Sequence, residues 1–129
     1  MPISSAIEIP KGMSYEVAAM TEPASCCVSG TEMIDYKSDS KIFIIGSGIM
    51  GILCLKFVKE KSIDYIVVSE PNPIRRKMAL EMGADFVVDP SSKSYQKDIK
   101  RLKGEHGFDI FIEAVGNPNL LSEGISYLR

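Results

Sequence analysis

The sequence predicts an α/β fold built on a parallel β-sheet, and three observations support that prediction. From residue 41 onward, short β-rich segments alternate with longer helical patterns, as in successive βαβ units. The first of these segments, Lys41 to Ile45, is apolar after its first residue, which is typical of a strand buried on both faces. A glycine-rich turn follows that strand directly and leads into a helix.

The remaining elements are expected in alternation along the chain. The expected strands are 41–45, 64–69, 84–89 and 108–115, and the expected helices are 48–61, 73–82, 95–103 and 118–129. Asn72 and Asn117 each precede a proline, and this pair is typical of a helix N-cap and first turn. Gly83 and Gly104 mark expected helix ends, whereas the last helix is expected to run to the end of the chain.

Residues 1–40 do not fit the alternation of strands and helices. They predict a short helix near Val17 to Met20, a second helix over 23–34 and a polar stretch before the first strand. We interpret residues 1–40 as a helical lead-in that is too small for its own core, and residues 41–129 as a single domain.

Composition excludes several classes of function. The 129 residues are 45% apolar and 25% charged, as in an ordinary soluble globular protein, and the net charge of −2 gives no reason to expect nucleic acid or an anionic membrane as partner. No apolar run approaches the roughly 20 residues that span a bilayer, and the N-terminus lacks the pattern of a signal peptide. The three cysteines form no disulfide framework, so we expect a cytoplasmic protein with reduced thiols.

The strongest motif is the glycine-rich turn between the first strand and the first helix of the sheet. Gly46 permits a tight turn, Gly48 lets the backbone approach a pyrophosphate, and Gly51 lets the helix lie close to the sheet. The helix N-terminus then presents N–H groups and partial positive charge to the phosphates. In this position the spacing predicts a Rossmann-type dinucleotide site formed by Gly46, Ser47, Gly48, Ile49, Met50 and Gly51.

An acidic residue, Glu70, ends the second expected strand. A carboxylate there accepts hydrogen bonds from the adenosine ribose and disfavours the extra phosphate of NADP. The repulsion between a carboxylate and a phosphate about 4 Å apart is on the order of several kcal/mol. NAD is therefore the expected cofactor, although Glu70 is alternatively a solvated strand-end residue. Arg75 and Arg76 leave the choice between NAD and NADP open, because a nearby arginine accommodates the NADP phosphate. The alternative is that these two arginines only form a solvated helix face.

Five segments together resemble one family, the zinc-dependent medium-chain alcohol and polyol dehydrogenases, in particular the sorbitol and threonine dehydrogenase-like branch. The resemblance covers nearly the whole chain and is specific only in combination. The segments are Glu22–Gly30, Gly46–Gly51, Val68–Arg76, Met78–Asp85 and Phe108–Gly116. The family implies that Arg75 acts at the ribose and that Val115 and Gly116 lie over the cofactor, in addition to the glycine turn and Glu70.

The resemblance implies hydride transfer in a homo-oligomeric parent enzyme, between NAD and a secondary alcohol or polyol held on a catalytic zinc. The chain departs from the family because the catalytic domain with its G-H-E motif and zinc-binding cysteine, the four-cysteine structural zinc site and the fifth and sixth strands are missing. Ser29 stands where many relatives have histidine. We therefore expect a truncated cofactor domain that is inactive by itself, and we assign no catalytic residue.

Glu22 matches a glutamate that lies at or near the catalytic zinc in the sorbitol dehydrogenase-like branch. It is the single candidate metal ligand, and the alternative is an exposed residue near a helix end. Cys26 and Cys27 are adjacent, so on a helix they point about 100° apart, and we interpret both as small core residues. His106 is expected in a loop without a catalytic partner.

Two other classes of function remain open, a regulatory nucleotide-sensing Rossmann module and, less favoured, an S-adenosylmethionine-dependent methyltransferase. Residues 1–40 argue against the first, because such modules start at the first strand. The glycine spacing and Arg75 argue against the second.

The strand over 108–115 is expected to expose a free edge. In the strand order 3-2-1-4-5-6 it would be covered by the missing strands, and its apolar side chains predict burial on both faces. It carries no proline or lysine that would discourage pairing. We expect this edge to self-associate, to be covered by another chain or to continue in a longer protein, unless the last helix folds over it.

Overall fold

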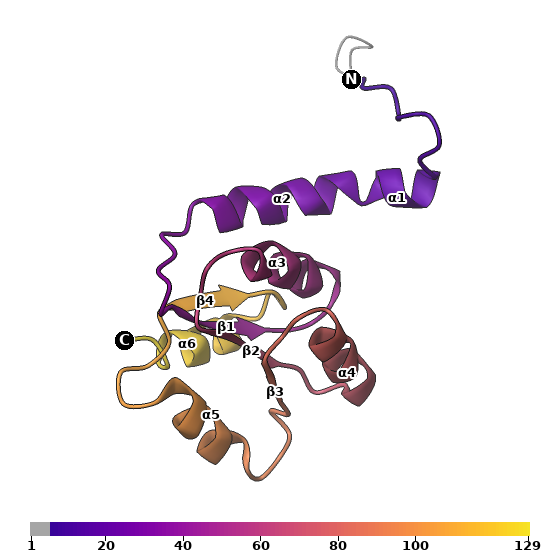
Figure 1. The fold of residues 1–129 in the computed structure, drawn as a ribbon. Helices are drawn as coiled ribbons and strands as arrows, with labels where there is room; N and C mark the ends of the chain where they lie inside the picture. The colour runs from indigo at the N-terminus through magenta and orange to yellow at the C-terminus, as the bar shows by residue number, and fades with distance from the viewer. Residues whose placement is uncertain (1–5) are drawn as a thin grey trace.

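The structure, a computed structural model, describes residues 6–129, so the N-terminal residues on which the expectation of no signal peptide rests lie outside it. A parallel sheet forms the centre of the molecule (Figure 1). Its strands are β1 (Lys41–Ile45), β2 (Tyr65–Ser69), β3 (Phe86–Val88) and β4 (Ile110–Glu113), in the order β3-β2-β1-β4. This order is the first part of the predicted Rossmann order, so the predicted fold class is confirmed.

Helices cover both faces of the sheet. They are α3 (Ile49–Lys59), α4 (Pro73–Glu81), α5 (Tyr95–Lys103) and α6 (Pro118–Ile125). Alternate side chains of β1 explain the two layers, because Phe43 packs with residues of α5 while Ile42 and Ile44 pack with residues of α3 and α4. The central strands are therefore buried on both faces, as their apolar sequence predicts.

The local signals for helix ends are confirmed at α4 and α5. The Asn72 side chain accepts hydrogen bonds from Ile74 N–H at 2.9 Å and Arg75 N–H at 3.2 Å, which caps α4 as predicted. The predicted range of α5 is matched residue for residue, and Gly104 ends it with a φ of +65°.

The predictions for the last strand and the last helix are wrong in three respects. The helix α6 ends at Ile125 rather than continuing to the end of the chain, because Tyr127 turns back into the core beside Phe43. Leu128 then forms a parallel bridge with Phe108 at the outer edge of β4. β4 itself is shorter than predicted and only half-buried, not buried on both faces.

The lead-in forms two helices, α1 (Tyr15–Ala19) and α2 (Thr21–Glu32), and α2 lies alongside α3 (Figure 1). The Cys27 thiol is buried and donates to the carbonyl oxygen of Met50 at 3.6 Å, as expected for a core residue. Cys26 is exposed, so its prediction as a core residue is wrong. Among the helices of residues 6–129, none has the length and apolar character needed to cross a membrane.

Candidate functional site

The predicted site residues meet at the carboxyl ends of the strands, where the chain crosses from one side of β1 to the other. A cleft of about 400 Å³ opens there, within the size range of small-molecule sites. Its walls include Gly46, Glu70, Arg75 and Val115. In open α/β sheets, ligands bind at this reversal of strand order, so the topology and the motif point to one place.

The other predicted residues divide between this cleft and its surroundings. Ser47, Gly48 and Ile49 line an adjoining hollow of about 280 Å³, which also reaches Arg75. Gly51 lies at the start of α3, while Met50 and Gly116 line neither the cleft nor the hollow.

The three glycines of the turn differ in whether the backbone angle or the surrounding space excludes a side chain. Gly46 has a φ of +94°, and a Cβ there would lie 2.7 Å from Val115 Cγ2. A Cβ on Gly51 would overlap the carbonyl oxygen of Gly46. Gly48 has an ordinary φ of −69°, and a Cβ there would meet no protein atom within 4 Å. The fold therefore requires glycine at positions 46 and 51, but not at 48.

The N-terminus of α3 opens beside Gly48. Gly48 is the N-cap and offers no side chain to the first-turn N–H groups, and no acidic residue lies in that turn. The unpaired N–H groups and the helix dipole together favour an anion at this point. The arrangement suits a phosphate that approaches over Gly48.

The Glu70 carboxylate is buried and joins the glycine turn to β2. Its Oε2 accepts hydrogen bonds from the Ser47 N–H at 2.9 Å and from the Ser47 hydroxyl at 3.1 Å. Its Oε1 accepts one from the Asn72 N–H at 2.9 Å. Burial alone would raise the pKa of Glu70, but these hydrogen bonds and the nearby Arg75 outweigh it and lower the pKa. Glu70 is therefore a fixed carboxylate and not a solvated strand-end residue.

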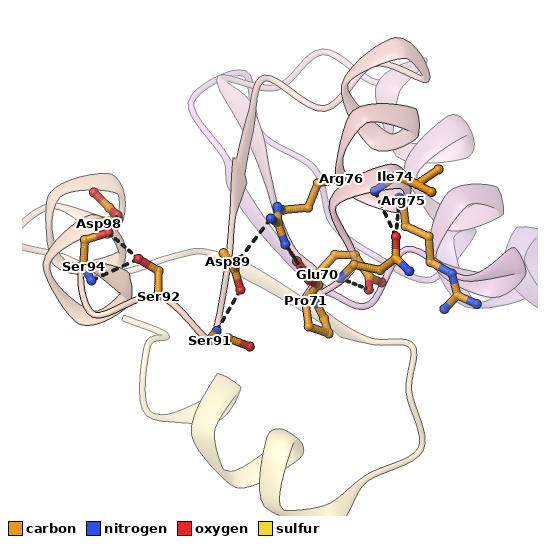
Figure 2. Close-up of polar contacts among 11 residues, drawn as sticks. Glu70, Pro71, Ile74, Arg75, Arg76, Asp89, Ser91, Ser92, Ser94 and Asp98 are labelled. Carbon is orange, nitrogen blue, oxygen red and sulfur yellow. Dashed lines mark hydrogen bonds and ion pairs between the residues drawn. The ribbon is translucent and has the colours of Figure 1, made fainter.

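Figure 2 shows that the two adjacent arginines have different surroundings. Arg76 Nη1 donates to the carbonyl oxygens of Glu70 and Pro71, both at 2.7 Å, and its Nη2 lies 3.0 Å from Asp89 Oδ2. Arg75 is exposed and extends away from Asp89 (Figure 2). Arg76 is therefore not part of a solvated helix face, since it joins the ends of β2 and β3.

Sequence reasoning missed a second carboxylate that shapes the cleft. Glu113 ends β4, and its carboxylate accepts hydrogen bonds from the Val115 N–H at 2.8 Å and the Gly116 N–H at 2.9 Å. These bonds fix the turn in which Gly116 takes a φ of +80°. An acidic residue at a strand end, three positions before a glycine, was the available signal.

The predicted metal ligand Glu22 has few partners. It is exposed near the start of α2, where its Oε1 accepts a hydrogen bond from the Cys26 thiol at 3.5 Å. Residues 6–129 contain no group of three or more His, Cys, Asp or Glu side chains placed to hold a metal ion. A catalytic zinc takes about three protein ligands, so the described residues by themselves do not fit one.

Comparison with known proteins identifies the class. The parallel sheet and strand order define a Rossmann-type domain, and residues 49–129 match the family model described as zinc-binding dehydrogenase. The chain therefore belongs to the zinc-binding dehydrogenase family. This assignment confirms the resemblance and argues against both the nucleotide-sensing module and the methyltransferase.

Individual relatives agree with the family assignment. The chain is 30% identical over 125 residues to an L-threonine 3-dehydrogenase of Pyrococcus abyssi, covering 97% of this chain and 36% of that protein. It is 29% identical over 121 residues to a sorbitol dehydrogenase of Bacillus subtilis, covering 94% of this chain and 34% of that protein. The chain also superimposes on a structure from Sinorhizobium meliloti that is bound to NADP and described as a candidate zinc-binding dehydrogenase. The TM-score is 0.85 at 26% identity, and the match covers 99% of this chain and 38% of that one. The chain thus spans about a third of the length of the relatives it matches.

Proposed function

We propose that residues 41–129 bind the adenosine and pyrophosphate parts of NAD, as the cofactor domain of a zinc-dependent medium-chain dehydrogenase that oxidises a secondary alcohol or polyol. The observation that carries this proposal is Gly48. Neither its backbone angles nor its packing requires glycine, yet its Cα faces open space at the N-terminus of α3. A close backbone approach by a pyrophosphate explains the glycine.

The contacts around the cleft support roles for several of the predicted residues. We assign the pyrophosphate to the turn from Gly46 to Gly51, and the adenosine ribose to Glu70. The Oε1 of Glu70 has a single hydrogen-bond donor, the Asn72 N–H, so it retains capacity for a ribose hydroxyl. Arg75 is free to contact the ribose or a phosphate from the rim. Val115 and Gly116 form the turn on the opposite side, held by Glu113.

The preference for NAD over NADP rests on the Glu70 carboxylate, whose lowered pKa keeps it charged at neutral pH. A fixed negative charge repels a 2′-phosphate, while Arg75 attracts it. We expect the carboxylate to dominate because it is buried and fixed by three donors, whereas Arg75 is exposed.

The proposal for the whole enzyme extends beyond this chain. The whole enzyme is a cytoplasmic homo-oligomer, and its zinc, when bound, polarises the alcohol. Glu22 is the single zinc ligand that this segment offers. The described residues do not complete a zinc site, so we expect the chain of 129 residues alone to oxidise no alcohol. Zinc-dependent NADH production from sorbitol or threonine by the purified chain would contradict this.

Titration of the purified chain tests the proposal. We expect NADH to bind with measurable affinity, NADPH to bind more weakly, and S-adenosylmethionine not to bind. Calorimetry gives all three affinities under one buffer condition. Binding of S-adenosylmethionine alone, or of no nucleotide, would refute the cofactor assignment, and tighter binding of NADPH would refute the preference for NAD.

A further inference from the structure

Two adjacent arginines follow β2 near the proposed cofactor cleft; Arg75 lines the cleft, whereas Arg76 is held beside it by other protein groups. Arg76 uses Nη1 for two backbone carbonyl oxygens and Nη2 for Asp89, and its side chain is only 19% exposed. Arg75 forms no ion pair with any residue in 6–129. Although the sequence places two positive charges at the end of β2, the structure leaves one of them free.

Asp89, the partner of Arg76, is itself held in place. Its Oδ1 accepts a hydrogen bond from the Ser91 N–H at 2.8 Å (Figure 2). Its carbonyl oxygen accepts one from the Ser92 N–H at 3.0 Å. The side chain of Asp89 is 31% exposed. Pro90 and Ser91, which follow Asp89 in the chain, line the cleft, so Asp89 pairs with Arg76 from the segment that forms this wall.

This arrangement has an electrostatic consequence for a nucleotide in the cleft. A guanidinium binds phosphate through a fork of N–H donors, and an arginine near the acidic residue of β2 is how such sites accommodate NADP. The Asp89 carboxylate cancels the charge of Arg76 and occupies a donor of its fork. With Asp89 in place, Arg76 is not available to a 2′-phosphate.

We propose that Asp89 is a specificity-determining residue, which favours NAD over NADP by holding and neutralising Arg76. The inference rests on the proposed function, because it requires that the cleft takes the adenosine half of a dinucleotide. It differs from the role of Glu70, because Glu70 acts on the ribose directly whereas Asp89 acts through Arg76.

The substitution Asp89→Asn tests the proposal. The side-chain oxygen of asparagine preserves the hydrogen bond from Ser91, while the negative charge opposite Arg76 is lost. We expect the affinity for NADPH to rise about three- to tenfold, as for the gain of one partly screened charge contact, and the affinity for NADH to change less than about twofold. In Asp89→Asn/Arg76→Met, the gain in NADPH affinity should disappear.

The control is Glu81→Gln, which removes one negative charge from α4, the helix that carries Arg76. Glu81 pairs with Lys77 at 3.8 Å on the exposed face and does not line the cleft, so neither affinity should change. Equal weakening of NADH and NADPH by Asp89→Asn would mean that Asp89 is merely structural, and an unchanged preference would also overturn the inference. If the unsubstituted chain binds neither nucleotide, the proposed function fails with it, whereas binding of NADH without the predicted shift refutes the role of Asp89 alone.

Discussion

At the scale of single residues, Gly48 is a position where the proposed binding requires glycine and folding does not. Because a Cβ at this position meets no protein atom within 4 Å, we expect Gly48→Val to fold with a loss of at most about 1 kcal/mol. The added methyl groups would occupy the space assigned to the pyrophosphate, so NADH binding should weaken at least about tenfold. Thermal unfolding and NADH titration of the same sample measure the two effects.

Two glycines serve as controls for that substitution. Gly30 in α2 also faces open space, so Gly30→Val should leave NADH binding unchanged. Gly46→Val should instead destabilise the fold, because of the positive φ of Gly46 and the clash with Val115. If Gly48→Val binds NADH as tightly as the unsubstituted chain, the pyrophosphate does not lie over this residue.

Glu70 gives the site a pH dependence of known sign. Its folded-state pKa lies below the ordinary value of 4.5, so its stabilising effect is complete above pH 4.5 and is lost as the pH falls through the folded-state pKa. At pH 7, Glu70→Gln should lower the free energy of unfolding by about 1.5–3 kcal/mol, the range for a charged hydrogen-bond acceptor. Urea unfolding at pH 7 and pH 3 should show the difference between the two proteins shrinking in acid. A constant difference would mean that the charge of Glu70 contributes nothing.

At the scale of the elements, Asn72 caps α4 with its side chain and bonds to Glu70 at the cleft with its backbone N–H. Asn72→Ala removes the side-chain bonds to the Ile74 and Arg75 N–H groups and should cost about 1 kcal/mol of stability. The Asn72 backbone N–H still donates to Glu70, so the affinity for NADH should fall by no more than about threefold. Asn119→Ala is a matched control within α6, where the Asn119 backbone N–H, not its side chain, bonds to the Asn117 cap. A stability loss equal to that of the control would show that the cap is dispensable.

Elements defined by local signals could be predicted from the sequence, whereas those defined by distant partners could not. The Asn-Pro cap of α4 and the apolar run of β1 lie within a few residues, and both were confirmed. The end of α6 depends on Tyr127 packing against Phe43, a contact between opposite ends of the domain. The role of Arg76 likewise depends on Asp89, beyond the end of β3. The glycine turn and Glu70 could be proposed from the sequence because their spacing, placed between a strand and a helix, is itself local information.

At the scale of the whole molecule, the outer edge of β4 is the feature from which we predict how the chain associates. The N–H and carbonyl groups of Phe108 point away from β1 and bond to Tyr127 and Arg129. The Ala114 N–H bonds to the Ile45 carbonyl oxygen in β1, so by alternation along the strand the backbone groups of Ile110 and Ile112 also face β1. Those of Phe111 and Glu113 therefore point outward, and β4 pairs with no strand on that side within residues 6–129. The helix α6 packs Gly124 against Phe111, which covers a face of β4 and not its edge.

We therefore expect the chain of 129 residues to self-associate at micromolar concentration through the edge of β4, because an unpaired, apolar strand edge is a template for pairing. Glu113→Pro removes one outward N–H donor and should shift the population toward monomer in light scattering. In hydrogen exchange, the amides of Phe111 and Glu113 should gain protection as the protein concentration rises, while the amides of β1 stay protected throughout. A monomer at all concentrations would mean that the short bridge between Phe108 and Leu128 already suffices to block the edge.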